Sequence, residues 1–369
     1  MRKDSFNSAC PYYTMFPLGF PKRILTRAKK GQVILDPFCG RGTTLFAARE
    51  KGLSSIGIDT SPIAVAISKA KIAFASPGEV LNVFDEIIES TPNDVSIPHN
   101  EFWARAYHPE TLLNLCKLRH GLLNFDDVDT DPVAILRVLA MGALHGPLNK
   151  GDTPSSFFSN QMMRTFATKP DYAVKYWDER CMQPPYSDVR NVIERRATRL
   201  LSSLPPQVGS STVLQGDARK PEYYGQLDDA ISWVITSPPY FGMSTYEEDQ
   251  WLRLWFLGGP DTPKYGNNNQ ISHRNQETFA LDLAKVWDQI ANNSKPELKM
   301  VVRFGEIGSR KSDHKKLFKQ SLEYSVAPWK ITYTRSAGRS ADGQRQSITM
   351  GKRGNSNSIE ESDFYVSIN

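Results

Sequence analysis

The feature that most constrains the fold is the stretch 31–75, where strand-type and helix-type patterns alternate. A short apolar run ends in Asp36 and a glycine-rich turn, and the helical segment after the turn stops at Gly52. A second apolar run ends in Asp59, and the Ser-Pro pair that follows is typical of a helix start. Strands joined by helical crossovers form parallel sheets with right-handed connections. The stretch therefore predicts an α/β fold that begins with a βαβα unit.

The middle of the chain, 76–205, has a different character. Four segments in it repeat apolar residues with the helical period, and strand signals are scarce, which predicts a largely helical insertion. Strand-like runs return after it. The five runs are 211–220, 231–240, 298–308, 329–337 and 363–368. The first three resemble parallel strands and the last two a closing antiparallel pair. Together with the two earlier strands they predict a doubly wound sheet of seven strands.

Composition bounds the class of protein. Hydrophobic residues make up 40% of the 369 positions and charged residues 23%, the balance of an ordinary globular protein. No apolar run approaches the roughly 20 residues that span a membrane. The first residues show no signal-peptide pattern, so we expect a cytoplasmic location. The four cysteines form no CxxC pair and indicate neither a zinc site nor a disulfide framework. A net charge of +5 permits a nucleic-acid partner without requiring one.

The glycine-rich turn, DPFCGRGTT, predicts a nucleotide-type pocket. Glycines let the backbone approach a ligand, and an acid at the end of the next strand, here Asp59, can accept hydrogen bonds from ribose hydroxyls. The third glycine of the dinucleotide fingerprint is missing, and Leu45 stands in its place, which disfavours a nicotinamide dehydrogenase. Asp36 puts an anion where a pyrophosphate would be repelled. A cationic ligand such as S-adenosylmethionine suits this electrostatic arrangement better.

Two motifs in one chain carry a resemblance to a known family. DPFCGRGTT resembles the cofactor motif of the amino-group (cytosine-N4 and adenine-N6) DNA methyltransferases, and TSPPY at 236–240 resembles their catalytic motif. YYTMFPLGFPKRIL and QGDAR resemble two further cofactor motifs. The resemblance covers about 1–75 and 206–310, and implies a Rossmann-like methyltransferase sheet that binds S-adenosyl-L-methionine. It assigns cofactor binding to Phe16, Pro17, Asp36, Pro37, Phe38, Gly40, Gly42, Thr43, Thr44, Asp59 and Asp217.

The catalytic residues that the resemblance implies fit amine chemistry. An exocyclic base amine is a poor nucleophile because its lone pair is delocalised into the ring. Ser237 Oγ and the Pro238 carbonyl, which Pro239 follows, can accept hydrogen bonds from the two N–H groups, and Tyr240 can stack on a base swung out of the duplex. Within the family, serine at the first position is associated more with cytosine N4 than with adenine N6. Ser237 therefore favours N4 and leaves N6 open.

Two basic segments are candidates for DNA contact, because phosphate binding needs Arg and Lys on elements that can follow a backbone. One supplies Arg164, Lys169 and Lys175, and the other Arg339, Arg345 and Lys352. The expected partner is double-stranded DNA. A separately acting restriction endonuclease and the oligomeric state stay open. The expected division is a cofactor-binding half over 1–75, a helical insertion and possible target-recognition region over 76–205, and a catalytic half over 206–369.

Other readings of the motifs are weaker. An RNA guanine-N2 methyltransferase also pairs such a glycine turn with a PPY motif, but usually carries aspartate at the Ser237 position and an N-terminal RNA-binding domain. A non-catalytic nucleic-acid-binding protein is disfavoured by the intact Ser237, Tyr240 and glycine turn. Cys39 is expected to be a small buried residue rather than a nucleophile. The cofactor motif precedes the catalytic motif here, whereas the DPFxGxGTT spelling is typical of members with the opposite order.

Overall fold

The computed structural model divides into two compact units. The helical unit comprises Met1–Pro11, Lys69–Pro205 and Tyr246–Asn267, and the sheet unit comprises Tyr12–Ser68, Pro206–Thr245 and Asn268–Asn369. Each unit is described by itself. The structure describes residues 5–12, 16–125, 129–147, 156–159, 169–202, 204–225, 231–242, 247–263, 271, 275–306, 312–339 and 360–369.

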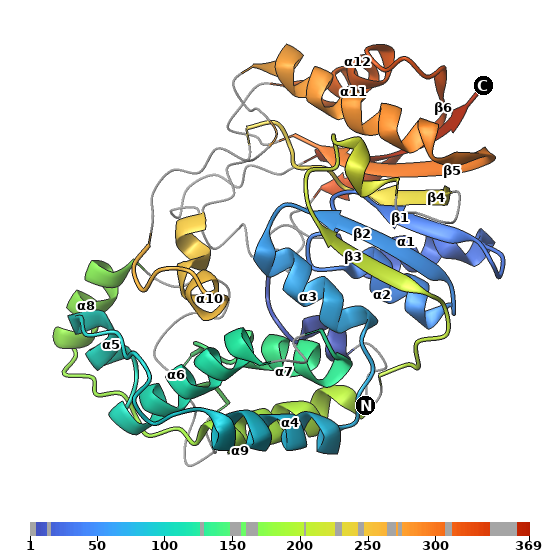
Figure 1. Cartoon of the computed structure of the whole chain (residues 1–369). Coiled ribbons are helices and arrows are strands. Elements are labelled where there is room, and N and C mark those ends of the chain that lie inside the picture. Colours follow the sequence, from blue (N-terminus) through green and yellow to red (C-terminus); the bar gives the residue numbers. More distant parts are fainter. Residues whose placement is uncertain are drawn as a thin grey trace. The chain divides into compact units, whose positions relative to one another are not determined.

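Within the described residues of the sheet unit, seven strands form one sheet in the order β3-β2-β1-β4-β5-β7-β6 (Figure 1). The first five pair in parallel, and β7 pairs antiparallel with both β5 and β6. The predicted seven-stranded doubly wound sheet with an antiparallel closing pair is confirmed. The strands are β1 (Val33–Asp36), β2 (Ser54–Asp59), β3 (Ser211–Gln215), β4 (Ile231–Thr236), β5 (Ser294–Gly305), β6 (Trp329–Arg339) and β7 (Glu360–Ile368).

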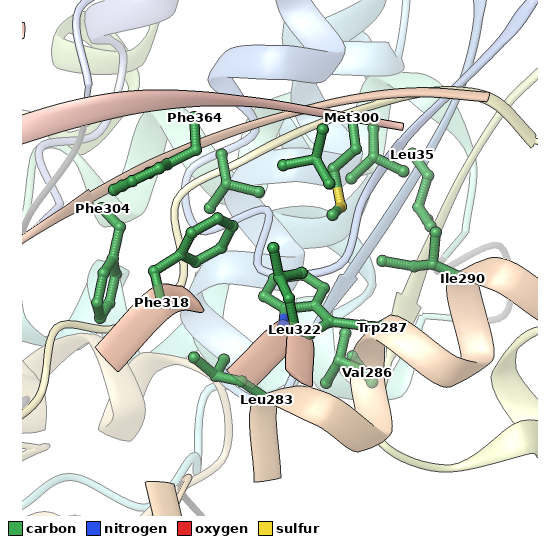
Figure 2. Packing of buried hydrophobic residues seen from close by; sticks show 14 of the residues in the cluster. Leu35, Leu283, Val286, Trp287, Ile290, Met300, Phe304, Phe318, Leu322 and Phe364 are labelled. Atoms are coloured by element: carbon green, nitrogen blue, oxygen red, sulfur yellow. The ribbon is translucent and has the colours of Figure 1, made fainter. Parts of the chain in front are cut away.

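Helices cover both faces of this sheet, as a parallel sheet requires. Val33 and Leu35 of β1 lie in the main apolar cluster, while Ile34 between them is also fully buried, outside that cluster. Figure 2 shows the cluster, where Trp287, Phe318 and Phe364 pack beneath the strands. The helical elements of this unit are α1 (Gly19–Ile24), η2 (Leu25–Arg27), α2 (Thr43–Glu50), α3 (Pro62–Ile72), which runs past the division at Ser68, η3 (Pro221–Tyr223), α11 (Gln276–Asn292) and α12 (His314–Glu323).

The helical unit contains a helix in each of the four stretches where apolar spacing predicts one. The start of α4 is determined by its capping residues: Ser76 and Glu79 form a capping box, and Pro77 lies in the first turn. α5 and α8 lie outside those four stretches and were not predicted. The elements are η1 (Ser5–Ser8), α4 (Pro77–Ser90), α5 (Glu101–Ala106), α6 (Pro109–Asn124), α7 (Asp131–Met141), α8 (Pro170–Asp178), α9 (Val189–Leu201), η4 (Glu247–Gln250) and α10 (Trp251–Phe256).

The helical unit takes in three segments that the expected division assigned to the halves of the sheet: 1–11, 69–75 and 246–267. At the N-terminus, Arg196 donates a hydrogen bond from Nη2 to the Ala9 carbonyl at 2.6 Å. Near α10, Trp255 packs on Trp103 with 4.4 Å between ring centroids, and Arg119 Nε donates to the Trp255 carbonyl at 2.7 Å. These contacts join positions far apart in the sequence, so the pattern within each segment could not reveal them.

None of the helices in the described ranges is both long enough and apolar enough to span a membrane.

Candidate functional site

The order of the sheet locates the place where a ligand can bind. From β1 the chain proceeds to β2 and β3 on one side, and later to β4 and β5 on the other. β1 and β4 are therefore neighbours whose connections leave in opposite directions, and ligands of open α/β sheets bind at the carboxyl ends of such a pair. Leu35 of β1 faces Val234 of β4 in the register. This brings Asp36 and Ser237, from the two motifs, to one edge of the sheet.

The glycine turn after β1 is built by close contact with α3. Gly40 and Gly42 both have positive φ, +49° and +69°, which side-chain-bearing residues rarely adopt. A Cβ on Gly42 would lie 2.7 Å from Ser68 Oγ. Ser68 in turn donates a hydrogen bond from its hydroxyl to the Gly40 carbonyl at 2.9 Å. Ser68 was missed by sequence reasoning, since nothing in the pattern of α3 distinguishes it from a core residue.

Asp36 is a buried carboxylate with only one side satisfied. Its Oδ1 accepts from Thr236 Oγ1 at 2.6 Å and from the Phe38 backbone N–H at 3.2 Å. Its Oδ2 is buried and has no hydrogen-bond partner among the described residues. Burial raises the pKa of Asp36 to about 6, against the opposing effect of the Thr236 hydrogen bond. An unsatisfied buried anion is costly, and a cationic group beside Oδ2 would relieve that cost.

The threonines of the turn behave differently from each other. The Thr44 hydroxyl donates to the Ile235 carbonyl at 3.1 Å, which ties the start of α2 to β4. Thr43 Oγ1 is buried and has no hydrogen-bond partner within the described part of the chain. Pro37 is buried, and Phe38 is partly buried against the main cluster. The turn thus leaves two buried oxygens, Asp36 Oδ2 and Thr43 Oγ1, without partners.

Asp59, at the end of β2, is engaged by backbone groups. Its Oδ2 accepts from the Gly40 N–H at 2.8 Å and its Oδ1 from the Ser61 N–H at 2.9 Å. Burial raises the pKa of Asp59, and these hydrogen bonds oppose the rise. Each carboxylate oxygen has a second lone pair, so Asp59 can close the glycine turn and still accept hydrogen bonds from a ligand.

Asp217, just beyond β3, is held by an arginine. Arg219 donates from Nη2 to Asp217 Oδ2 at 2.7 Å and from Nε to Oδ1 at 2.9 Å, while its Nη1 reaches Asp282 at 2.7 Å. Burial alone would raise the pKa of Asp217, but the Arg219 hydrogen bonds hold it below the ordinary value. The Gly216 N–H donates to the Asp59 carbonyl at 2.9 Å, so Asp217 lies next to the end of β2.

The upstream motif places Phe16 in an edge-to-face aromatic pair. Phe16 is buried and meets Phe20 edge to face with 5.0 Å between centroids. The Arg303 guanidinium lies 4.1 Å from the Phe20 ring centroid. Pro17 is exposed, and its carbonyl accepts the Phe20 N–H at 2.9 Å.

The catalytic motif follows the fully buried strand β4. Ser237 and Pro239 are partly buried, and Pro238 is buried. Within the described residues, Ser237 Oγ has no hydrogen-bond partner, so its acceptor capacity is not used by the fold. Neither proline can donate to a ladder, which explains why β4 ends at Thr236. Ser237 therefore directly follows Thr236, the residue that is hydrogen-bonded to Asp36, and within the described residues its hydroxyl is not engaged.

Tyr240 differs from the expected open stacking platform. Only 7% of it is exposed, and its hydroxyl donates to Glu361 Oε1 at 2.7 Å. Its ring meets Phe304 edge to face, with 5.5 Å between centroids and 86° between the planes. Cys39, by contrast, is buried as expected, 3.6 Å from Ser68 Oγ, and burial raises the pKa of its thiol well above the ordinary value. Such a thiol is a poor nucleophile.

The candidate DNA contacts are only partly described. Lys169 is the exposed N-cap residue of α8, and Lys175 on α8 is exposed. Lys175 lines a pocket of about 680 Å³ whose other polar lining includes four carboxylates, an unfavourable place for a phosphate: Glu101, Asp171, Asp178 and Glu179. Arg339 ends β6, but its side chain lies outside the described residues, as do Arg164, Arg345 and Lys352 entirely. Among the described residues, no cluster of His, Cys, Asp and Glu could hold a metal ion.

Comparison with known proteins supports the motifs. The family model of the N6/N4 DNA methylases matches residues 2–70. The type II methyltransferase M.BsoBI of Geobacillus stearothermophilus is 40% identical over 272 residues, covering 62% of this chain and 48% of that protein. M.HpaI of Haemophilus parainfluenzae is 33% identical over 89 residues, covering 24% and 28%. The matched part spans about half the length of M.BsoBI and less of M.HpaI.

Solved structures add little. An rRNA methyltransferase of Streptomyces viridochromogenes is 13% identical, with a TM-score of 0.34 over 96% of this chain and 86% of that one. This structural similarity is too low to assign a function. The family model over residues 2–70 and the sequence relatives make this chain similar to the amino-group DNA methyltransferases, a family that uses S-adenosyl-L-methionine.

Proposed function

We propose that this chain transfers a methyl group from S-adenosylmethionine to an exocyclic base amine in double-stranded DNA, with cytosine N4 as the target. One observation carries the proposal. Among the described residues, Asp36 has a buried oxygen without a partner and Ser237 has an unengaged hydroxyl. Asp36 ends β1, Ser237 directly follows β4, and Thr236 links the two strand ends through its 2.6 Å hydrogen bond to Asp36. A cation-binding carboxylate and an amine-binding hydroxyl thus share one edge of the sheet.

The residues of the turn fit the cofactor. S-adenosylmethionine supplies a methyl group on a cationic sulfonium when bound. Asp36 Oδ2 offers the anion that its positive groups need, and Gly40 and Gly42 let the backbone come close. Asp59 keeps lone pairs for ribose hydroxyls, and Asp217, oriented by Arg219, can accept from the adenine amine. Thr43, beside the turn, supplies a further unpartnered oxygen, and Phe16 and Pro17 are assigned to the flank of the pocket.

Ser237 and Pro238 activate the substrate amine. Two acceptors that bind its N–H groups draw the nitrogen towards tetrahedral geometry and localise its lone pair for attack on the methyl group. The nitrogen–carbon bond would form as the methyl–sulfur bond breaks, the electron pair would leave with the thioether of S-adenosylhomocysteine, and the surplus amine proton would pass to solvent. The Pro238 carbonyl is well suited because the proline ring limits backbone motion. Holding both reactants at the same edge of the sheet supplies rate through proximity. No covalent enzyme intermediate is required, which agrees with the buried, unreactive state of Cys39.

The choice of cytosine N4 rests on Ser237 and on the family association of serine with that target. Adenine N6 is the alternative, since the printed names of the relatives do not state the base. The helical unit, on α8 and the segment before it, is the proposed region that reads the target sequence. Lys169 is the described residue there that best suits a phosphate contact. Double-stranded DNA is the proposed partner, and a separate endonuclease is proposed because the relatives are type II methyltransferases.

A labelling experiment tests the activity. The purified chain is incubated with tritiated S-adenosylmethionine and either unmethylated DNA or tRNA, and the labelled nucleoside is identified by mass spectrometry. We expect label in DNA as N4-methylcytosine. N6-methyladenine would overturn the cytosine assignment, and label confined to tRNA would overturn the DNA assignment.

Ser237→Ala tests the acceptor role. We expect kcat to fall by roughly 10²–10³-fold, the usual cost of losing one hydrogen bond made in the transition state. Cofactor affinity should not change. Ser232→Ala, which removes a buried hydroxyl from the same strand, is the matched control and should leave kcat near that of the wild type. Full activity of Ser237→Ala would remove Ser237 from the mechanism.

A further inference from the structure

The C-terminal strand supplies a buried acid to the catalytic motif. Glu361 lies on β7, where it pairs with Gly305 of β5 in the antiparallel register. It is only 4% exposed, and its Oε1 accepts the Tyr240 hydroxyl hydrogen at 2.7 Å. A hydrogen bond from a hydroxyl to a buried carboxylate is among the stronger kinds in proteins. The contact therefore joins two residues 121 positions apart in the chain.

Gly305 makes room for this contact. A Cβ at Gly305 would lie 2.8 Å from the Glu360 carbonyl oxygen, 2.9 Å from Glu361 Cγ and 3.0 Å from Tyr240 Cε2. Any side chain there would press on both Tyr240 and Glu361, although φ at Gly305 is not positive. The absence of a side chain at this position of β5 thus lets the backbone of β7, Glu361 and Tyr240 come close together.

Tyr240 needs an anchor of this kind. Two prolines precede it, so the backbone at 238 and 239 has no N–H to donate to a neighbouring strand. The ring is instead located through its side chain, by Glu361 at the hydroxyl and by the edge-to-face contact with Phe304. Two contacts at different points of one rigid ring fix both its position and its plane.

We propose that Glu361 is a positioning residue that acts through Tyr240, anchoring the buried ring so that the catalytic motif is held in one place. The inference rests on the proposed methylation of a flipped base. Because only 7% of Tyr240 is exposed, its ring acts by fixing the backbone just before it, and with it the Ser237 hydroxyl and the Pro238 carbonyl that the target amine must reach. Glu361 itself touches neither the substrate nor the cofactor in this account.

The test uses the full chain, tritiated S-adenosylmethionine and unmethylated bacterial genomic DNA, with kcat and both KM values measured. Glu361→Ala should lower kcat about tenfold or more, the effect of losing a hydrogen bond to a charged group. The KM for S-adenosylmethionine and its calorimetric Kd should not change. Glu361→Gln keeps an oxygen acceptor and should recover most of the activity. Glu360→Gln is the matched control, because Glu360 is the exposed neighbour that pairs with Lys315 at 3.5 Å, and it should behave as the wild type.

A double-mutant cycle separates positioning from general support of the fold. If Glu361 acts through Tyr240, Tyr240→Phe lowers kcat, and adding Glu361→Ala to it causes no further loss. Three results would overturn the inference: full or raised kcat in Glu361→Ala, equal losses in Glu361→Ala and Glu361→Gln accompanied by weaker cofactor binding, or additive losses in the cycle. Should Glu361→Ala fail to fold, Tyr240→Phe still decides, because it removes the same hydrogen bond from the other side, and a wild-type kcat in that variant would overturn the inference. Wild-type protein that binds the cofactor but labels no DNA would instead overturn the proposed function.

Discussion

The carboxyl ends of β1 and β3 each carry an aspartate of a cofactor motif, and the two are built in opposite ways. Asp36 is buried with Oδ2 unpartnered among the described residues, and its pKa is raised to about 6. Asp217 is partly exposed and bound by Arg219, and its pKa is lowered. Acids of neighbouring cofactor motifs therefore need not have the same role. Asp36 can still attract a cation through Oδ2, whereas Asp217 is already oriented by Arg219 in the free protein.

The largest predicted effect is on cofactor affinity at the β1 end. Asp36→Asn removes the only charge of that carboxylate while keeping its size, so the affinity for S-adenosylmethionine at pH 8 should fall by about 100-fold. Asp217→Asn is the matched control and should cost less, because its carboxylate is already committed to Arg219. Isothermal titration calorimetry measures both. Equal losses of S-adenosylmethionine affinity in the two variants would show that Asp36 and Asp217 contribute alike.

The same substitution should stabilise the protein without cofactor. A carboxyl whose pKa is raised on folding contributes stability that is complete below its unfolded pKa, 3.8, and is lost as pH rises through about 6. At pH 8 Asp36 therefore destabilises the free protein by an amount on the order of 2–3 kcal/mol. Asp36→Asn should raise the free energy of urea-induced unfolding at pH 8 and not at pH 4. Because the pKa of Asp217 is lowered, Asp217→Asn should instead lower the free energy of unfolding at pH 8, by less than about 1 kcal/mol.

The glycine turn gives a smaller and more local contrast. Gly40→Ala and Gly42→Ala both force alanine into a positive φ, but only the Gly42 Cβ meets Ser68, at 2.7 Å, whereas nothing lies within 4 Å of a Cβ at Gly40. We expect Gly42→Ala to weaken S-adenosylmethionine binding about tenfold more than Gly40→Ala, because the contact must push α3 or the turn aside. Adding Ser68→Ala to Gly42→Ala should recover part of that loss. Equal affinities would show that the contact does not shape the site.

The smallest effect is predicted at the β3 end. Arg219→Met keeps most of the side-chain length but frees the Asp217 carboxylate, and its pKa should return towards the ordinary value. The pair is partly exposed, so the loss of cofactor affinity should be only about threefold at pH 8. A loss as large as that of Asp36→Asn would place the main cofactor contact at β3 rather than β1.

The sequence was sufficient for the sheet and for the two motif ends, because both depend on local pattern: apolar runs, a glycine turn and paired prolines. What it could not supply were contacts across the sheet. Glu361 and Gly305 meet Tyr240 only because β5 and β7 pair in one register, and Ser68 meets Gly42 only because α3 packs on the turn. The surroundings of Lys175 were hidden for a related reason, since charge in a segment does not reveal the carboxylates that lie near it in space, and its DNA contact stays a prediction.

The proposed cofactor site depends most on Asp36, the anion that would bind the positive groups of S-adenosylmethionine. The decisive measurement is the affinity for S-adenosylmethionine by calorimetry between pH 5 and 7.5, for the wild type and for Asp36→Asn. Because the pKa of Asp36 is about 6, wild-type affinity should be level above that pH and fall steadily below it, and the variant should bind weakly with little slope. A variant that matches the wild type in affinity and in pH profile would contradict the account.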